Sequence, residues 1–312
     1  MTNAKVNSRR RKDIFLSIVI PSYNSEKCIS QCLASLRQQT QRDDVEVIVV
    51  DSSPEDISDF IHEKFPFVRV THLNERTFPG TARTVGIAKA HGSRIAFIDT
   101  DCRAGDSWVD RIIAAHKNDK NVVGGSVANG TPRSLVGTAE YLIEFNEHIP
   151  AMPVGHVRFI PTCNISFKRG VFEKIGKLED TIKGSDTLFC RRILLSGESI
   201  YFDRDITVWH INRTSLEKYL RNQYDLGFGG AQVRTMVEDQ VGAILVHMPI
   251  LIPFIPAART LLIGRRLFKH DKRLFLQFLG LYPLVFLGLV AYSKGFWDGL
   301  KAVKKETREE SK

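Results

Sequence analysis

Glycine-rich phosphate-binding loops and clustered cysteines are both missing from this 312-residue sequence. The first apolar segment, residues 14–20, is followed by neither G-x-G-x-x-G nor G-x-x-x-x-G-K-S/T. Conventional dinucleotide binding and a Walker P-loop are therefore disfavoured. Of the five cysteines only Cys28 and Cys32 are close together, without the second pair that a zinc site needs. Reduced thiols are expected.

The sequence also lacks a recognisable secretory signal. Four basic residues, 9–12, precede an apolar run that is short and interrupted by Ser17. This run ends in Pro21-Ser22-Tyr23-Asn24 rather than in a cleavage site. We therefore expect a basic tail over residues 1–13, followed by a domain that folds in the cytoplasm.

Charge is distributed unevenly along the chain. The formal net charge is +9, and residues 241–312 hold twelve Lys/Arg against five Asp/Glu, or +7, which leaves +2 for the first 240 residues. Apolar runs interleave the basic residues of the tail, so an anionic membrane surface fits this tail better than nucleic acid does. No nucleic-acid partner is predicted.

Apolar strands and amphipathic helices alternate over the first hundred residues, as in a nucleotide-binding α/β domain. Strands are predicted at residues 15–20, 45–50, 68–71 and 94–98, and helices at 25–39, after Pro54, and at 78–91. Beyond them, strands are predicted at 122–127, 158–167 and 201–210, and helices at 105–117, 135–145, from Asp186 and at 215–224.

The functional prediction depends on the stretch Arg94–Asp101. Residues 95–98 are all apolar, which indicates a buried strand. Asp99 and Asp101 follow at its carboxyl end, where open α/β sheets bind ligands. Two carboxylates at this spacing can share a hard divalent cation, although aspartates are also common in turns after strands.

Four motifs, in this order and spacing, resemble family 2 glycosyltransferases of the GT-A fold. They are Ile20-Pro21-Ser22-Tyr23-Asn24, Val49-Val50-Asp51-Ser52-Ser53, residues 82–87 around Arg83, and Phe97-Ile98-Asp99-Thr100-Asp101. The resemblance covers about residues 14–230, so we predict a GT-A domain of α/β class over residues 14–235. It implies an inverting enzyme that uses a nucleotide-diphosphate sugar, with a UDP-sugar favoured.

The resemblance also implies roles for individual residues of the donor site. Asp99 would lie near the ribose or a metal, and Asp101 would be a ligand of a divalent cation, Mn²⁺ or Mg²⁺. Such a cation, together with an arginine, neutralises the charge that develops on a diphosphate leaving group. The expected nucleotide contacts are Pro21, Tyr23 and Asp51 around the base and Arg83 near the diphosphate.

Two residues further along the chain complete the expected site. Asp186 follows Ser185 where the family usually has Glu-Asp, and the resemblance makes Asp186 the general base on the acceptor hydroxyl. An aspartate here also suits the start of a helix, but the order of motifs favours the base. His210 ends a predicted strand: it is either a structural residue or, as in many GT-A enzymes, a metal ligand beside Asp101.

Two apolar runs dominate the expected membrane-associating segment, residues 236–312. Residues 241–258 and 274–293 contain no Lys, Arg, Asp or Glu, although prolines interrupt both. By length each run is a transmembrane candidate, but two spans would carry the basic linker, residues 264–273, across the membrane against the positive-inside rule. Segments lying in one leaflet remove this conflict. The alternative is that both runs are core helices.

The sequence therefore predicts a metal-dependent glycosyltransferase (EC 2.4) at the cell membrane, with its catalytic domain on the cytoplasmic side. Its acceptor is expected to be lipid-linked or otherwise membrane-borne, for glycan or cell-envelope polysaccharide synthesis. One alternative is a nucleotidyltransferase, which usually needs a glycine-rich basic loop where this chain has residues 21–27. The other is a non-catalytic membrane scaffold.

Overall fold

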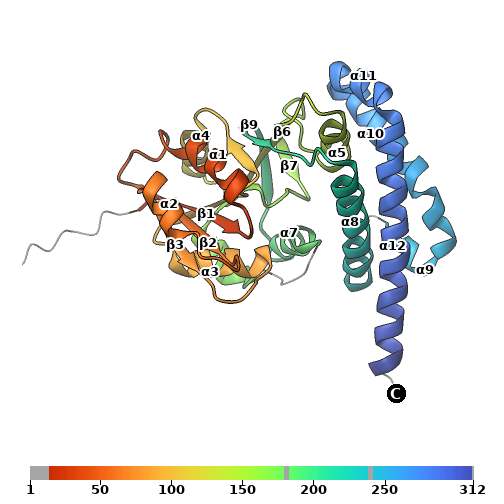
Figure 1. Cartoon of the computed structure of the whole chain (residues 1–312), viewed down its shortest axis with the longest axis horizontal. Helices are drawn as coiled ribbons and strands as arrows, with labels where there is room; N and C mark the ends of the chain where they lie inside the picture. Colours follow the sequence, from red (N-terminus) through yellow and green to blue (C-terminus); the bar gives the residue numbers. More distant parts are fainter. Residues whose placement is uncertain (1–13, 179–182, 238–241, 311–312) are drawn as a thin grey trace, which may run out of the picture.

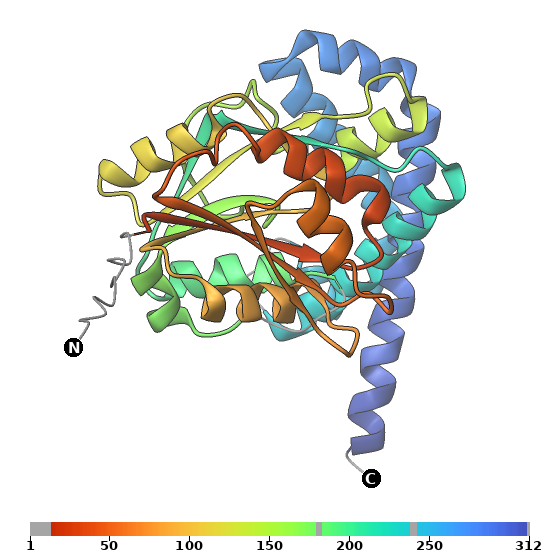
Figure 2. The same ribbon diagram turned by 60° about the vertical axis from the view of Figure 1, so that its left-hand side comes forward.

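The computed structural model describes residues 14–178, 183–237 and 242–310. A nine-stranded mixed sheet, with strand order β3-β2-β1-β4-β8-β6-β9-β5 and β7 paired to β9, runs through the molecule with helices on both faces (Figures 1 and 2). The strands are β1 Leu16–Ser22, β2 Val45–Asp51, β3 Val68–His72, β4 Arg94–Ile98, β5 Cys102–Ala104, β6 Val122–Asn129, β7 Gly155–Val157, β8 Asn164–Lys168 and β9 Ile200–His210.

The first half of the sheet is parallel and the second half is mixed. β1 pairs in parallel with β2 and β4, and β2 pairs in parallel with β3. β8 then joins β4 antiparallel, and β9 lies parallel to β6 and antiparallel to β5. The predicted α/β class is confirmed, and the ligand-facing carboxyl ends of β1, β2 and β4 lie at one edge.

Both faces of β1 are buried, which explains its unbroken apolar sequence. Ile18 and Ile20 point into a core shared with helices α1 and α4, whereas Val19 points into a second core shared with α3 and α7. The helices of this part are α1 Glu26–Leu36, α2 Ser58–Lys64, α3 Pro79–Lys89, α4 Trp108–Lys117, α5 Leu135–Glu144, α6 Arg169–Ile175 and α7 Ser185–Leu195.

Several predicted boundaries are wrong. The helix expected directly after Pro54 begins only at Ser58. The strand expected over residues 158–167 begins only at Asn164, because Pro161 cannot donate to a strand ladder and the chain turns through Thr162. This turn brings Thr162 to the start of α7.

Helix α8, Leu216–Met236, runs well past the predicted end at residue 224, because it packs along the C-terminal helix α12, Tyr282–Glu310 (Figure 1). Glycines permit this close contact: a Cβ atom on Gly227 would lie 2.0 Å from the carbonyl oxygen of Tyr292. α12 therefore shares the core of the molecule, and Val285 and Leu289 are fully buried.

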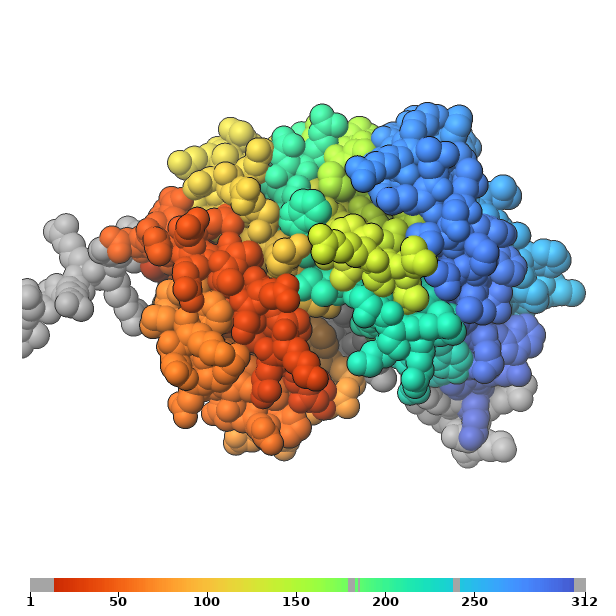
Figure 3. All heavy atoms as spheres, turned by 45° about the horizontal axis from the view of Figure 1, so that its top comes forward, coloured from red at the N-terminus to blue at the C-terminus, as the bar shows by residue number. Residues whose placement is uncertain are grey.

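The prolines break both apolar runs of the tail, as the sequence predicts. The first run forms α9 Ile244–His247, the 3₁₀ helix η1 Pro249–Phe254 and the start of α10 Ile255–His270. Among the described residues no single helix is long and apolar enough to cross a bilayer. One pair of helices, α11 (Lys272–Gly280) and α12, could cross it by length and composition, but the two helices are bent by 79° at the break between them. In Figure 3 the residues from 244 onward form one lobe beside α5 and α8.

Candidate active site

Asp51 lies at the carboxyl end of β2, fully buried, next to the end of β1. Its carboxylate accepts hydrogen bonds from the hydroxyl groups of Ser22 and Ser53, each at 2.7 Å. Nδ1 of His72 lies 3.1 Å from its other oxygen. These contacts hold the carboxylate rigidly at the edge of the sheet where the sequence predicts the nucleotide base.

Tyr23 follows the buried Pro21 and lies outside the sheet, with 37% of its surface exposed. The guanidinium of Arg76 lies 4.7 Å from the centre of the Tyr23 ring, in a cation–π arrangement. The aromatic ring can stack on a nucleotide base, and the neighbouring cation can bind the phosphate of the same nucleotide. Arg76 was not predicted from the sequence.

Arg83 and Asp99 form an ion pair at the same edge, in which the arginine is buried and the aspartate is half-buried. Nη2 of Arg83 donates to Asp99 at 2.5 Å, and only 3% of the arginine side chain is exposed. Burial disfavours the charge of Arg83, but the carboxylates of Asp99 and Asp186 outweigh it and raise the pKa of Arg83. Burial, together with Asp101 and Asp186, raises the pKa of Asp99, although Arg83 acts against this shift. Asp101 and Asp186 therefore both lie within electrostatic reach of Asp99.

Asp101 and His210 meet because β5 pairs with β9, which places Cys102 opposite His210. Nε2 of His210 lies 3.5 Å from Oδ2 of Asp101, and Nδ1 of His210 lies 2.9 Å from Oδ1 of Asn212. If Nδ1 donates to Asn212, the lone pair of Nε2 points towards Asp101, which is the tautomer a metal ligand requires.

The donor set at this point is a carboxylate, an imidazole and a thiol. The ligand atoms of Asp101, Cys102 and His210 all lie within 4.8 Å of one another. Oxygen and nitrogen ligands suit Mg²⁺ and Mn²⁺, whereas a sulfur ligand suits softer metals. Burial raises the pKa of Cys102 well above its usual value, so its sulfur stays a neutral thiol. Asp101 and His210 thus fit a hard divalent cation.

Asp186 is the second residue of α7 and not its N-cap, which is Gly184 in a left-handed conformation. One oxygen of its carboxylate accepts the backbone N–H of Thr162 at 3.0 Å, and the other accepts the Thr162 hydroxyl at 2.8 Å. These two hydrogen bonds fix the direction of the carboxylate. Thr162 was not predicted, because it is far from Asp186 in the sequence.

The sequence pattern of the family described as "Glycosyl transferase family 2" matches residues 17–176, slightly more than half of the chain. The chain belongs to this family. It is 27% identical over 253 residues to glycosyltransferase AglE of Haloferax volcanii, covering 78% of this chain and 82% of that protein. It is also 27% identical over 223 residues to the glucosyl-dolichyl phosphate glucuronosyltransferase of the same organism, covering 62% and 68%.

Solved structures of S. aureus TarS share the fold. Residues 1–349 of TarS in complex with UDP-GlcNAc align with a TM-score of 0.51 at 16% identity, covering 94% of this chain and 92% of that chain. Together with the family match, this similarity establishes the GT-A fold that the sequence predicts. The predicted family is therefore confirmed, and so is glycosyltransferase activity.

In this family 2 glycosyltransferase a buried polar network links α5 to α8 beside the predicted metal ligands. Glu140 is fully buried and accepts a hydrogen bond from Nη1 of Arg213 at 2.9 Å. The amide of Asn222 donates to Glu140 at 3.0 Å and to Glu144 at 2.6 Å. Burial and the neighbouring Glu140 raise the pKa of Glu144 to about 7. None of these residues was predicted, because their meeting depends on how α8 packs.

Proposed function

We propose that this glycosyltransferase transfers a sugar, with inversion, from a UDP-sugar to a hydroxyl of a lipid-linked or otherwise membrane-borne acceptor. One observation carries the proposal: Asp99, which is paired with Arg83, lies within electrostatic reach of both Asp186 and Asp101, and Asp101 lies 3.5 Å from Nε2 of His210. The UDP-GlcNAc complex of the similarly folded TarS supports the choice of donor.

In this proposal Asp186 acts as the general base. The two hydrogen bonds from Thr162 orient its carboxylate towards the acceptor hydroxyl, whose proton it takes. The hydroxyl then attacks the anomeric carbon from the face opposite the diphosphate, which leaves with the bonding electrons. Pro21, Tyr23 and Asp51 hold the nucleotide base, and Arg83 keeps a positive charge beneath the diphosphate.

Asp101 and His210 would hold the divalent cation, Mn²⁺ or Mg²⁺, that the sequence predicts. When bound there, it would neutralise the charge that develops on the diphosphate leaving group. Asn212 supports this role, because its contact with Nδ1 keeps Nε2 of His210 available as a ligand.

We further propose that the helices from α9 to α12 lie against the cytoplasmic leaflet of the cell membrane and bind its lipids. Large apolar side chains are exposed along them, and Ile250, Leu261 and Leu276 keep 75%, 73% and 67% of their surface exposed. Leucine and isoleucine side chains gain roughly 1.5–3 kcal/mol each on full burial, so a few of them suffice for docking. The similarity to the glucosyl-dolichyl phosphate glucuronosyltransferase of H. volcanii supports a lipid-linked acceptor.

The family match favours this proposal over the two alternatives, a nucleotidyltransferase and a non-catalytic scaffold. A thermal-shift screen of UDP-, GDP- and dTDP-sugars with Mn²⁺ tests the donor, and we expect the largest stabilisation from a UDP-sugar. If none of these compounds stabilises the protein, the proposed function is wrong.

Membrane docking has its own test. Sedimentation with phosphatidylglycerol vesicles should be lost when Leu261, Leu262 and Leu276 are all replaced by serine. Leu195→Ser is the matched control, because Leu195 is 65% exposed but belongs to α7. Equal sedimentation of the triple variant and the parent would contradict docking through these helices.

A further inference from the structure

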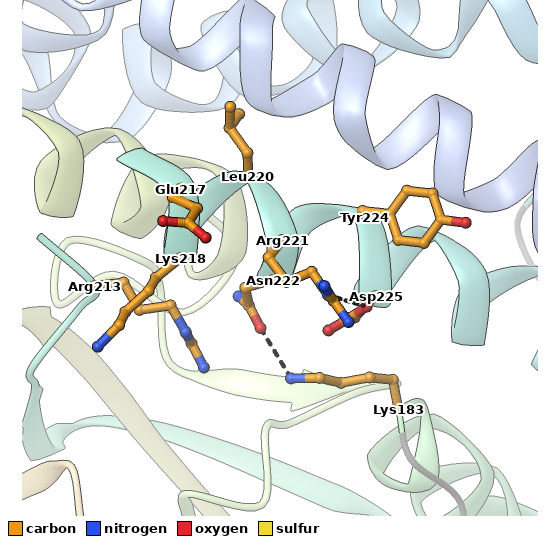
Figure 4. A pocket seen from close by; sticks show the side chains of 9 residues that line it. All are labelled: Lys183, Arg213, Glu217, Lys218, Leu220, Arg221, Asn222, Tyr224 and Asp225. Atoms are coloured by element: carbon orange, nitrogen blue, oxygen red, sulfur yellow. Dashed lines mark hydrogen bonds and ion pairs between the residues drawn. The ribbon is translucent and has the colours of Figure 1, made fainter. Parts of the chain in front are cut away.

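A pocket of about 620 Å³ lies between the N-terminal half of α8 and Lys183, which stands just before α7 (Figure 4). In Figure 4 Arg213 and Lys218 lie at one end of the pocket, Arg221 points along α8 towards Asp225, and Lys183 reaches the pocket from the opposite wall. Asn222 also lines the pocket, and its Oδ1 accepts a hydrogen bond from Nζ of Lys183 at 2.9 Å.

Positive charge dominates the lining of this pocket. Four cationic residues face two acidic ones, Glu217 and Asp225. Arg221 approaches Asp225 only at 3.7 Å and keeps 80% of its side chain exposed. Lys218 makes no hydrogen bond or ion pair with the described residues, so its charge is available to a ligand. Arg213, by contrast, is engaged by Glu140.

The first turn of α8 adds to this potential. Its N-cap, Ser215, makes no side-chain capping bond to the helix, which is 21 residues long. The amide groups at a helix N-terminus carry a partial positive charge and favour anions. Glu217 and Lys218 belong to this turn and line the pocket. The pocket therefore combines a helix N-terminus with side-chain cations.

The pocket adjoins the proposed catalytic residues. Lys183 is three residues before Asp186, and Gly229 of α8 lets the backbone of Lys183 approach closely, because a Cβ atom there would lie 2.6 Å from the Lys183 carbonyl oxygen. Arg213 lies on the other side, within electrostatic reach of Asp101. An anion bound in the pocket would thus lie beside the base and the metal ligands.

The order of surfaces across the molecule matches the order of groups in a lipid-linked sugar. α8 separates the pocket from α12, and the exposed apolar side chains lie on α12 and the helices beyond it (Figure 1). A lipid chain, a phosphate and a sugar would meet an apolar face, a cationic pocket and a general base in turn. Leu220 and Tyr224, which also line the pocket, provide apolar contact at its α8 wall.

We propose that this pocket binds a phosphate or diphosphate group of the acceptor, through Lys183, Lys218 and Arg221. The inference rests on the proposed function and adds to it the chemical class of the acceptor. A guanidinium and ammonium groups around one space suit the several oxygens of a phosphate. Its binding would hold the acceptor sugar so that a hydroxyl reaches Asp186.

The test measures binding of farnesyl phosphate to the full chain by calorimetry, first alone and then with the donor site saturated by UDP and Mg²⁺. The variant is Lys218→Gln/Arg221→Gln; both residues are exposed, so the fold should be retained. We expect it to bind farnesyl phosphate roughly tenfold more weakly or worse, with UDP affinity and melting temperature unchanged. Lys117→Gln, which removes an exposed cation from α4, should match the parent.

Two further probes identify the source of the phosphate. Farnesol should bind at least tenfold more weakly than farnesyl phosphate, and the double variant should remove this difference. Equal farnesyl phosphate binding by variant and parent would overturn the proposal, as would displacement of UDP by farnesyl phosphate. The last probe is dihexanoyl phosphatidylglycerol. If it binds the parent as tightly as farnesyl phosphate does, and binds the double variant as much more weakly, the proposal is overturned in favour of a site for membrane headgroups.

Failure of the proposed function would look different. If the parent protein does not bind UDP at all, the donor assignment is wrong, whereas farnesyl phosphate titrated alone still reports on the pocket. The two measurements therefore separate the acceptor site from the donor site.

Discussion

Nε2 of His210 lies 3.5 Å from the carboxylate of Asp101, because the short strand β5 pairs with the last residues of β9. The backbone reinforces this contact, since the N–H of Ile211 donates to the carbonyl of Asp101 at 2.7 Å. Two potential ligands are thus held by strand pairing rather than by flexible loops. Such a rigid pair is what binding of a cation at a defined position requires.

The first prediction concerns the cation. Asp101→Ala should weaken UDP binding in the presence of Mn²⁺ by roughly tenfold or more, since a carboxylate ligand is lost. The fold should be retained, because 37% of the Asp101 side chain is exposed. Calorimetry with and without Mn²⁺ measures the effect, and Asp106→Ala, at an exposed neighbouring position, is the control. If Asp101→Ala binds UDP in the presence of Mn²⁺ as tightly as the parent does, the metal assignment is wrong.

The second prediction concerns the base. Asp186→Asn keeps the size of the side chain and can still accept the N–H of Thr162. It removes the proton acceptor, so sugar transfer should fall about a hundredfold or more, while UDP-sugar binding is retained. Transfer rates and donor affinity are measured on the same preparation. Transfer near the parental rate would exclude Asp186 as the base. The next candidates, Glu179 and Asp180, lie outside the described residues.

The third prediction tests Thr162 as a positioning residue. Thr162→Val removes the hydroxyl that donates to Asp186 at 2.8 Å and keeps the backbone hydrogen bond and the shape. Loss of a hydrogen bond to a charged group typically costs about 1.5–3 kcal/mol, so kcat should fall roughly tenfold or more. KM for the donor should stay unchanged, and Thr162→Ser should restore the rate. A change in donor KM alone would contradict a positioning role.

The fourth prediction uses the contact between α8 and the segment before α7. A Cβ atom at Gly229 would lie 2.6 Å from both the Cβ and the carbonyl oxygen of Lys183, so Gly229→Ala must displace the turn that carries Asp186. We expect slower transfer and a loss of about 1–3 kcal/mol in unfolding free energy. Gly170→Ala is the control, because no atom lies near the added Cβ. Equal rates and melting temperatures for both variants would contradict the prediction.

The fifth prediction concerns pH. Burial and Glu140 raise the pKa of Glu144 from 4.5 to about 7, although the nearby Arg213, His210 and Lys183 act against this shift. Folding therefore takes up a proton between these values, and the stability of the parent falls as the pH rises through this window. Glu144→Gln should lose this dependence and be more stable than the parent at pH 8, by on the order of 1–3 kcal/mol.

Denaturant unfolding at pH 5 and pH 8 measures this effect. The difference between Glu144→Gln and the parent should shrink towards pH 5, where the parent carboxyl is already protonated. An unchanged difference at both pH values would mean that Glu144 does not titrate in this range in the folded protein.

The sequence by itself determined most strands and helices of the first hundred residues and the breaks in the tail. An unbroken apolar run such as residues 95–98, bounded by polar residues, favours a strand buried on both faces, and a proline prevents the helix before it from continuing. The aspartates after β4 and the start of α7 near Asp186 are also local features. They depend on neighbours in the sequence, so the pattern of residue types suffices to predict them.

Only the tertiary structure decided which side chains meet. The pairing of β5 with β9 brings His210 to Asp101, and the turn before β8 brings Thr162 to Asp186. The length of α8 is decided by its packing on α12, through glycines such as Gly227 that leave room for a neighbouring backbone. These contacts join residues far apart in the chain, and their stability comes from burial shared between elements, which no local pattern encodes.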